Sequence, residues 1–545
     1  MFAVMGAAAH CGDQASPSAD GGATADAASV IDAADATLGA DAALDASISD
    51  SAPEGGGVET PDAAGPLDAQ AIDAGVGDAG DGDVTEAGAA EGGEGGAALD
   101  PRCTDGGTTT ISGVVYDPAM MDPLYGVTVF VPDPASPLPA FARTGASCAA
   151  CSDLYPATVN ASAVTDATGH FTIAMTPGGQ PVLAGDGVPL VVQIGKWRMQ
   201  STIGYVETCA DNPQPDRALH LPVNSSQGDM PDIAISTGRA DSLECLPLRI
   251  GVDPAEYTAG ASSQGHIHIF QGAGGATTAP SAPASSEGLW DSIGDLQKND
   301  AVLLSCEGAE TSNMTTANQQ SLSDYASAGG RVFASHFHYA WFNSGPFASD
   351  NLATWKPGDG FLDDTRSFPG NVTTLLNSSG DSGVTFPEGV AFASWLGTVG
   401  ALTSGQLPIW FARSNAVVTP VNTASQPWLM FDGTVPAPGT NTTQYFSFDT
   451  PLGDGGRADG DAAAAPKCGR VVYSDLHVSG GPGINEPGVP PDYDGGVNRA
   501  ITPSGCASHP LTPQEKALEF MLFDLSSCLQ SIGSPPQVVT HPAPR

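Results

Sequence analysis

The chain is poor in positive charge. It has 18 Lys and Arg residues against 61 Asp and Glu residues, which gives a formal net charge of −43 at pH 7, and no Lys or Arg precedes Arg102. A surface this acidic repels phosphate backbones, so nucleic acid is excluded as a partner. The chain also lacks any run of about 18 or more apolar residues, and we expect no segment that spans a membrane.

The start and the end of the chain lack the composition of a folded domain. Residues 1–100 contain 20 of the acidic residues, and the rest of this stretch is mostly Ala, Gly and Ser. Such a segment cannot bury enough apolar surface to offset the entropy lost on ordering, so we predict a disordered linker over residues 12–102. We also predict a disordered tail over residues 531–545.

Residues 1–11 form a short stretch of apolar and small residues that ends at Cys11. This stretch resembles the end of a bacterial lipoprotein signal, which implies acylation of Cys11 and attachment to a membrane by a lipid anchor only. His10 stands where such signals carry a small residue, so either translation starts upstream or the signal is not functional. The resemblance implies an extracytoplasmic protein, either an outer-membrane or cell-surface lipoprotein or a secreted protein.

Cysteine usage supports the same compartment. In an oxidising environment the cysteines beyond residue 100 predict a set of disulfides with one odd member left over. A zinc site or a redox pair within 148–151 is the alternative, but no second pair has matching spacing, and disulfides are favoured. The disulfide candidates are Cys103, Cys148, Cys151, Cys209, Cys245, Cys306, Cys468, Cys506 and Cys528.

Short apolar segments separated by Gly, Pro and Asp turns occupy residues 103–240 and predict an all-β sandwich, with its last strand at residues 232–237. Residues 111–117, 126–129 and 165–171 carry three strand and turn motifs in order. Together they resemble the carboxypeptidase regulatory-like, transthyretin-like family, which implies a spacer or binding module without catalytic residues. We expect disulfides to hold the insertion at residues 134–156, with Cys103 or Cys209 as partners.

Strand-like and helix-like segments alternate over residues 241–530, which predicts an α/β domain with a doubly wound, flavodoxin-like sheet. The last helix is expected to begin after Thr512, with Glu515 completing a capping box. Expected strands cover residues 246–253, 266–270, 300–305, 331–335, 390–397, 407–414, 427–433, 444–450 and 468–478. Expected helices cover residues 289–299, 318–330 and 511–528.

Residues 300–304, 325–330, 331–336 and 469–477 carry four motifs in order: a buried strand, a helix ending in Gly-Gly, a strand leading to His, and Gly-Arg-Val followed by His. They resemble the class I glutamine-amidotransferase-like superfamily, and within it the ThuA-like branch. In amidotransferases a nucleophilic Cys occupies the sharp elbow after the second strand. Here His336 takes that position, and the chain contains neither Gly-Cys-x-Gly nor His-x-Glu, so glutamine hydrolysis is not expected.

Polar residues follow the expected parallel strands at the edge where ligands bind in such sheets. We expect an active crevice, if one exists, to contain Glu307, His336, His338 and His477, with His336 at the elbow. Residues two apart on a strand share a face, so His336 and His338 could hold a divalent metal. The residue pair 266 and 268, with Glu307 or Asp475, is a variant of this hypothesis, and plain bonding to loop backbone is the alternative.

A Cys306 nucleophile activated by His336 is a further alternative, although a disulfide is expected for this cysteine. The motifs together predict a secreted or surface-anchored binding protein, more a binder than an enzyme, with no cofactor beyond the possible metal. Its ligand would be a carbohydrate or another cell-envelope component, by analogy with the two families. The alternative is a hydrolase or lyase that acts on an envelope sugar through the His and Glu crevice, with assistance from a metal.

Overall fold

A computed structural model describes residues 100–141, 143, 145–148, 151–156, 158–174, 182–262, 264–311, 314–363, 366–377, 383–431, 441–452, 467–479, 501–506 and 508–530. The expected signal with Cys11 lies outside these residues, as do the expected tail and nearly all of the expected linker. No helix within the described ranges has the length and apolar character that a bilayer crossing requires.

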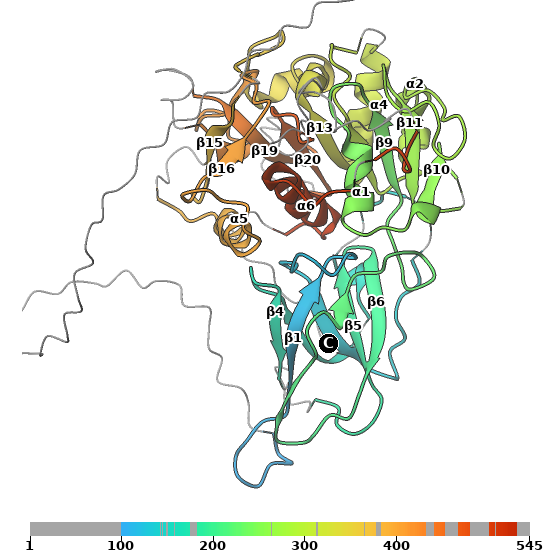
Figure 1. Cartoon of the computed structure of the whole chain (residues 1–545), viewed down its shortest axis with the longest axis vertical. Coiled ribbons are helices and arrows are strands. Elements are labelled where there is room, and N and C mark those ends of the chain that lie inside the picture. The colour runs from blue at the N-terminus through green and yellow to red at the C-terminus, as the bar shows by residue number, and fades with distance from the viewer. Residues whose placement is uncertain are drawn as a thin grey trace, which may run out of the picture. The chain divides into compact units, whose positions relative to one another are not determined.

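Two four-stranded sheets form the first part of the described chain (Figure 1). In one sheet β1 pairs with β4, β7 and β8, and in the other the order is β3-β2-β5-β6. Alternate residues of β1, β2 and β5 face one shared core, which explains why the apolar residues alternate in the sequence. The bounds are β1 Thr110–Tyr116, β2 Thr128–Pro132, β3 Val159–Val164, β4 His170–Ile173, β5 Val188–Ile194, β6 Trp197–Ile203, β7 Asp211–Pro213 and β8 Leu219–His220.

The expected turn before β4 is present. Asp166 accepts a hydrogen bond from the backbone N–H of Thr168 at 2.8 Å, and Gly169 has a φ of +72°, which suits glycine. Phe171 then points into the core and is 1% exposed, as the sequence predicted. The resemblance to a regulatory-like sandwich remains a prediction, because the sheets do not by themselves identify a family.

A ten-stranded sheet forms the second part, in the order β10-β11-β9-β12-β13-β20-β19-β18-β15-β16 (Figure 1). The first six strands are parallel, and those after β20 are antiparallel. We number the parallel strands in chain order and leave out the edge strand β10. They then lie side by side in the order 2-1-3-4-5, which is that of flavodoxin-like sheets. The parallel strands are β9 Ile233–Thr237, β10 Tyr257–Ala259, β11 Ile267–Gln271, β12 Ala301–Leu304, β13 Arg331–Ser335 and β20 Gly469–Ser474.

The antiparallel half comes from the middle of the chain. Its strands are β15 Phe368–Val372, β16 Leu407–Ile409, β18 Gln426–Met430 and β19 Thr443–Thr450, and a separate two-stranded pair is β14 Thr354–Trp355 with β17 Ala416–Val417. The helices are α1 Leu246–Arg249, α2 Glu287–Trp290, α3 Ile293–Leu296, α4 Thr316–Ser327, α5 Pro387–Thr398 and α6 Pro513–Ser526.

Both faces of the parallel half are buried. Ile233 and Phe333 face a core that also contains α5, α6 and the paired sheets of the first part. Ala234 and Val332 face a second core, which contains residues of α2, α3 and α4. Because successive side chains point to opposite faces, strands covered on both sides are apolar throughout, and this is why β12 is a continuous apolar run.

Three sequence-based expectations were wrong. The segment at 232–237 was assigned to the sandwich, but β9 lies between β11 and β12 in the large sheet. Residues 246–253 were expected to form a strand, but α1 begins at Leu246 with Pro247 in its first turn. Residues 390–397 were also expected to form a strand and belong to α5, where Phe392, Trp395 and Leu396 are buried at helical spacing.

Disulfides join distant parts of the described chain. Cys103 pairs with Cys209, Cys148 with Cys468 and Cys245 with Cys506, and Cys528 is also disulfide-bonded. The insertion is therefore joined to the large sheet through Cys468, and not to Cys103 or Cys209 as expected. Such bonds are consistent with an extracytoplasmic protein.

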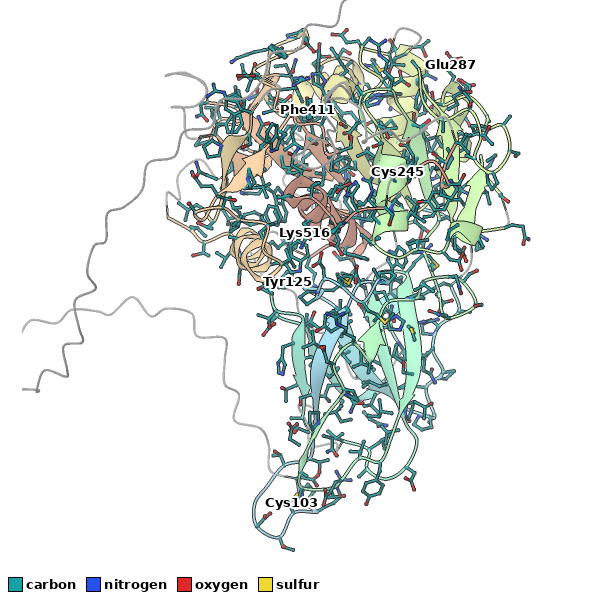
Figure 2. All side chains as sticks on the ribbon, viewed as in Figure 1. Cys103, Tyr125, Cys245, Glu287, Phe411 and Lys516 are labelled. Carbon is teal, nitrogen blue, oxygen red and sulfur yellow. A yellow bond between two sulfur atoms is a disulfide. The ribbon has the colours of Figure 1, made fainter. Side chains whose placement is uncertain are left out.

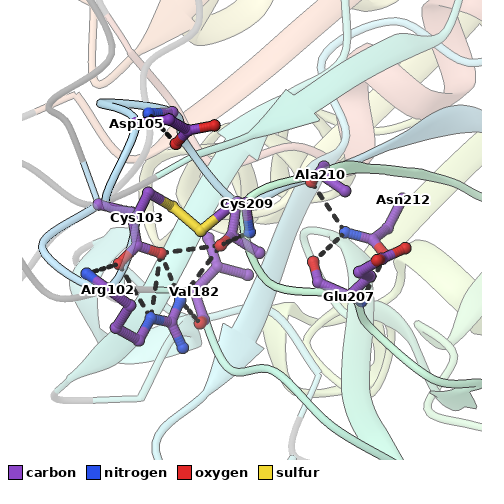
Figure 3. The surroundings of a disulfide bond; sticks show 11 residues. Arg102, Cys103, Asp105, Val182, Glu207, Cys209, Ala210 and Asn212 are labelled. Carbon is purple, nitrogen blue, oxygen red and sulfur yellow. Dashed lines mark hydrogen bonds and ion pairs between the residues drawn. A yellow bond between two sulfur atoms is a disulfide. The ribbon is translucent and has the colours of Figure 1, made fainter.

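Figure 3 shows the Cys103–Cys209 disulfide with the hydrogen bonds around it. Arg102 donates to the carbonyl oxygen of Val182 at 2.8 Å, and the Asn212 amide donates to the carbonyl oxygens of Glu207 and Ala210. The disulfide joins the loop between β6 and β7 to the start of the described chain. The Arg102 bond ties that start to the segment before β5, and the Asn212 bonds hold the loop to itself.

Helix α6 joins the large sheet to the paired sheets. It begins as predicted, with Thr512 accepting from the N–H of Glu515 and the Glu515 carboxylate accepting from the N–H of Thr512. Phe520 of α6 stacks on Tyr125, with ring centroids 5.8 Å apart. Tyr125 and Lys516 are labelled at this junction in Figure 2.

Buried carboxyl groups lie at the same junction. Glu519 is fully buried, its carboxyl group is hydrogen-bonded to Asp122, and the charged groups acting on it are Asp117, Asp122 and Lys516. Burial raises the pKa of Glu519 well above its usual value, and burial likewise raises the pKa of Asp117. Both carboxyl groups therefore hold their protons in the folded protein at pH values where the unfolded chain has lost them.

We predict that stability falls as pH rises through and above the range where free carboxyl groups ionise. Each group that stays protonated only in the folded state removes about 1.4 kcal/mol of unfolding free energy per pH unit until its folded pKa is reached. Glu519→Gln should flatten this slope between pH 5 and pH 8, measured by urea unfolding. Asp186→Asn, which changes an exposed carboxylate, is the control, and an equal slope in wild type and Glu519→Gln would contradict the prediction.

Candidate functional site

Three chemically capable side chains meet at the carboxyl edge of the parallel strands. Cys306 lies two residues beyond β12, His336 directly follows β13 and His477 lies three residues beyond β20. These strands are neighbours in the sheet, in the order β12-β13-β20, so their carboxyl ends emerge side by side. Cys306 and His336 are fully buried, and His477 is 6% exposed.

His336 occupies a sharp elbow. Its φ is +42°, a left-handed conformation that is unusual for a residue other than glycine. Strand β13 ends at Ser335, and a 3₁₀ helix, His336–Trp341, begins at once. Phe411, labelled in Figure 2, is a second strained residue with a φ of +52°, and its ring stacks on His477 at 6.4 Å. Strained backbone of this kind is common at functional sites.

The donor atoms of the three side chains converge. His336 Nδ1 lies 3.4 Å from Cys306 Sγ and 3.0 Å from His477 Nε2. In the part of the chain that the structure describes, this is the one group of three potential metal ligands whose donor atoms all lie within 4.8 Å of one another. We call Cys306, His336 and His477 the Cys-His-His cluster.

The hydrogen bonds of His336 define its tautomer. Its Nε2 lies 2.9 Å from the carbonyl oxygen of Asp359. A carbonyl oxygen only accepts hydrogen bonds, so Nε2 carries the proton and donates it. In the neutral ring Nδ1 is then the lone-pair nitrogen, and its lone pair faces the other two members of the cluster.

Burial keeps Cys306 and His336 uncharged. It raises the pKa of the Cys306 thiol to about 12, against the opposing effect of hydrogen bonds from the N–H groups of Phe337 and Gly308. Burial lowers the pKa of His336 to about 3, and the nearby Arg413 guanidinium lowers it further. At neutral pH the protein alone therefore presents a thiol and neutral imidazole here, and not a thiolate–imidazolium pair.

Asp475 braces the elbow without joining the cluster. Its Oδ2 accepts from the backbone N–H groups of Asn415 and Ala416, at 2.8 and 3.1 Å. The Tyr473 hydroxyl lies 3.0 Å from both Asp475 Oδ1 and the His336 carbonyl oxygen. Burial raises the pKa of Asp475 to about 7, so a protonated Asp475 can donate to the Tyr473 oxygen while the hydroxyl donates to His336.

His338 does not pair with His336. Its Nε2 donates to the carbonyl oxygen of Ser305 at 2.9 Å, and its Nδ1 accepts from Trp341 Nε1 at 3.0 Å. Both ring nitrogens are thus engaged in neutral hydrogen bonds, and burial lowers the pKa of His338 to about 4. The expected His336 and His338 pair assumed a continuing strand, whereas both residues lie in the 3₁₀ helix.

Glu307 also points away from the cluster. Its carboxylate accepts from the N–H of Ala273 and faces Gly272, where a Cβ atom would lie 2.4 Å from Glu307 Oε1. It therefore contacts the segment that follows β11, where the close approach of its carboxylate leaves no room for a side chain at Gly272.

The other predicted histidine pair lies at the opposite edge of the sheet. His266 Nδ1 and His268 Nε2 lie 3.3 and 3.1 Å from Asp232 Oδ1, just before or within the first residues of β9 and β11. A pair of histidines with one carboxylate was expected, although with a different acid. Arg143 also bonds Asp232, so a cation already neutralises this carboxylate.

Cys306 was named from the sequence only as an alternative nucleophile and was not included among the expected crevice residues. It was expected to form a disulfide, but it is a free thiol, the one free cysteine among the described residues. A usable signal was present in the sequence: Cys306 follows β12 at the same edge where His336 follows β13. Asp359, Arg413 and Asn415, which surround His336, come from the irregular middle of the chain and carried no motif.

Comparisons with known proteins add little to this geometry. No family model and no curated protein matches the chain. Among solved structures, the chain is similar to a ThuA-like protein from Bacteroides uniformis at 9% identity, with a TM-score of 0.21, over 45% of this chain and 81% of that chain. This similarity extends over less than half of the chain.

Proposed function

We propose that the protein binds a divalent metal ion of the Zn²⁺ class through Cys306, His336 and His477. The convergence of one sulfur and two ring nitrogens from three neighbouring strands carries this proposal. Cys and His are the ligands that zinc prefers, and a cluster without carboxylate ligands disfavours Ca²⁺ and Mg²⁺.

The distances within the cluster fit a tetrahedral ion. With Zn–N bonds of about 2.0–2.1 Å and a Zn–S bond of about 2.3 Å, neighbouring ligands are separated by about 3.3 Å for N···N and about 3.6 Å for N···S. The corresponding separations here are 3.0 and 3.4 Å. Two of the three separations are therefore within a few tenths of an ångström of the tetrahedral values, and all donor atoms lie within 4.8 Å of one another.

The surroundings of His336 favour the same role. Metal-binding histidines commonly donate their second ring N–H to a carbonyl or carboxylate, which fixes the tautomer and aims the free nitrogen at the ion. His336 donates from Nε2 to the carbonyl oxygen of Asp359 in this manner. A bound ion would also favour the thiolate form of Cys306, because coordinating thiols lose their proton.

Three protein ligands leave one position of a tetrahedral ion for water or a ligand, which is the arrangement of catalytic zinc sites. This favours the hydrolase or lyase hypothesis over a purely binding role, with an envelope component as the substrate class and an extracytoplasmic location. The elbow carries His336 on an amidotransferase-like fold, so the proposal does not involve glutamine hydrolysis. Trp290, Trp341, Trp395 and Trp428 are at most 1% exposed and cannot stack on a sugar, whereas Trp355 and Trp410 are half-buried.

Metal content tests the proposal. Wild type incubated with Zn²⁺ and dialysed should retain one ion per chain, measured by elemental analysis, whereas Cys306→Ala and His477→Ala should retain none and bind zinc at least about a hundredfold more weakly. Glu307→Gln is the matched control and should retain the ion, because the Glu307 carboxylate contacts Gly272 and Ala273 after β11 and not the Cys-His-His cluster. Full retention in both cluster variants would exclude the site.

A further inference from the structure

A short segment covers His336. Residues 356–361 lie against Asn415, whose side-chain amide donates to the carbonyl oxygens of Lys356 and Gly358 at 2.8 and 2.7 Å. The N–H of Gly358 donates to the Tyr339 hydroxyl at 2.8 Å. We call residues 356–361 the strap.

The strap packs closely against residues 414 and 415. Gly360 has a φ of +61°, and a Cβ atom at this position would lie 1.9 Å from Asn415 Oδ1. The carbonyl oxygen of Gly360 accepts from the N–H of Ser414 at 2.9 Å. Residues 414 and 415 therefore form the surface on which the strap rests.

Asp359 of the strap makes two contacts with the site. Its carbonyl oxygen accepts from His336 Nε2, and its carboxylate Oδ1 lies 3.9 Å from Arg413 Nε. The Phe361 ring also covers Arg413, with the guanidinium carbon 5.7 Å from the ring centroid. The Arg413 side chain is 6% exposed, whereas the Asp359 side chain is 61% exposed.

Arg413 lies within electrostatic reach of the Cys-His-His cluster. Its charge acts on both Cys306 and His336. A buried guanidinium is suited to recognising planar anions such as carboxylates, which it can bind through two parallel hydrogen bonds. The Asp359 carboxylate lies beside this guanidinium and is largely in water.

We propose that Asp359 stands in for the carboxylate of the protein's ligand. A carboxylate-bearing ligand would pair with Arg413 and displace the Asp359 side chain. Asp359 of the strap would then release His336 Nε2, while the bonds of residues 356, 358 and 360 persist, and this opens the way to the cluster. This inference rests on the proposed function for the role of the cluster, but its core claim concerns Arg413, Asp359 and the strap, which are present without a metal.

Chemical labelling of His336 tests the proposal in metal-free protein. Diethyl pyrocarbonate acylates the lone-pair nitrogen of a neutral imidazole. The bond to Asp359 holds the proton on His336 Nε2, so release of the strap uncovers Nε2 and lets it become the lone-pair nitrogen, and the rate of labelling reports that release. His338 lies in the same peptide and is held by Ser305 and Trp341, which makes it an internal control in the mass spectrum. Acetate and glucuronate are the carboxylate probes, with chloride at equal ionic strength and glucose as their controls.

We expect acetate and glucuronate to speed labelling of His336 by about threefold to fivefold, the scale of one partly exposed ion pair, and to leave His338 unchanged. Asp359→Asn should be labelled at the faster rate without any probe. Arg413→Gln should show no response to either carboxylate. Asp363→Asn, which changes a nearby acid that pairs with Arg366, should behave as wild type.

Two outcomes would overturn the proposal. One is that neither carboxylate nor Asp359→Asn changes labelling of His336. The other is that chloride or glucose speeds labelling as much as the carboxylates do, since the recognised group would then not be a carboxylate. Metal content is measured separately, so a protein that binds no zinc but responds to carboxylates would contradict the proposed function and leave this inference standing.

Discussion

Arg470→Met is expected to lower the free energy of unfolding by about 3–5 kcal/mol, the cost of removing one partner from a buried ion pair. Arg470 belongs to β20, and its side chain is 2% exposed. Its guanidinium donates to Asp449 at 2.8 Å and to Asp524 at 2.9 Å, and lies 3.6 Å from Glu388. Methionine fills a similar volume but leaves these buried carboxylates without their cation.

Chemical denaturation of wild type and variant at neutral pH measures this loss. Arg366→Met is the matched control, because Arg366 is 59% exposed and pairs with Asp363 at the surface, where such pairs contribute about 1 kcal/mol or less. Adding Asp449→Asn to Arg470→Met should recover part of the stability, since it removes one of the carboxylates left without its cation. A loss from Arg470→Met as small as that of the control would contradict the prediction.

The parallel half of the large sheet could be predicted from the sequence because its strands are buried on both faces. Burial of this kind requires continuous apolar runs such as residues 301–304, and the helices between them carry their own end signals, including the capping box at Thr512. The antiparallel half was harder to predict. Its apolar segments are separated by long loops, and the helical spacing of Phe392, Trp395 and Leu396 was mistaken for a strand.

The location of the site could also be predicted, but its membership could not. Strand ends at one edge indicated where His336 and His477 would lie. The elbow at His336 was not visible in the pattern, and it turns the chain into a 3₁₀ helix that separates His338 from the cluster. Cysteine composition suggested a disulfide for Cys306, whereas only the pairing of β12 with β13 brings its sulfur beside His336.

Residues that surround the cluster lie far apart in the sequence. Asp359 and Arg413 belong to segments without periodicity. They come together because Asp359 follows β14 and Arg413 precedes β17, and these two strands pair with each other. No local pattern encodes such contacts, since loop residues are positioned by the scaffold that they connect. The sequence therefore predicts the sheet and its carboxyl edge, but not the loop residues that surround the cluster there.

Removal of metal should have the second large effect. An ion that binds only the folded chain stabilises it by about 4 kcal/mol when its free concentration is about 1,000 times its dissociation constant. Wild type with excess Zn²⁺ should therefore resist urea more strongly than wild type with a chelator, measured without reducing agent so that the disulfides persist. His477→Ala should unfold at the same urea concentration in both conditions, because it lacks one of the three ligands.

The second histidine cluster provides the control for this experiment. His266→Gln alters the pair at Asp232, on the opposite edge of the sheet, and should keep the full difference between zinc and chelator. If His266→Gln abolished the difference while His477→Ala retained it, the ion would bind at Asp232 and not at the elbow. Arg143 makes that outcome unfavourable, because its guanidinium already bonds the Asp232 carboxylate, and a metal ion would have to displace one cation with another.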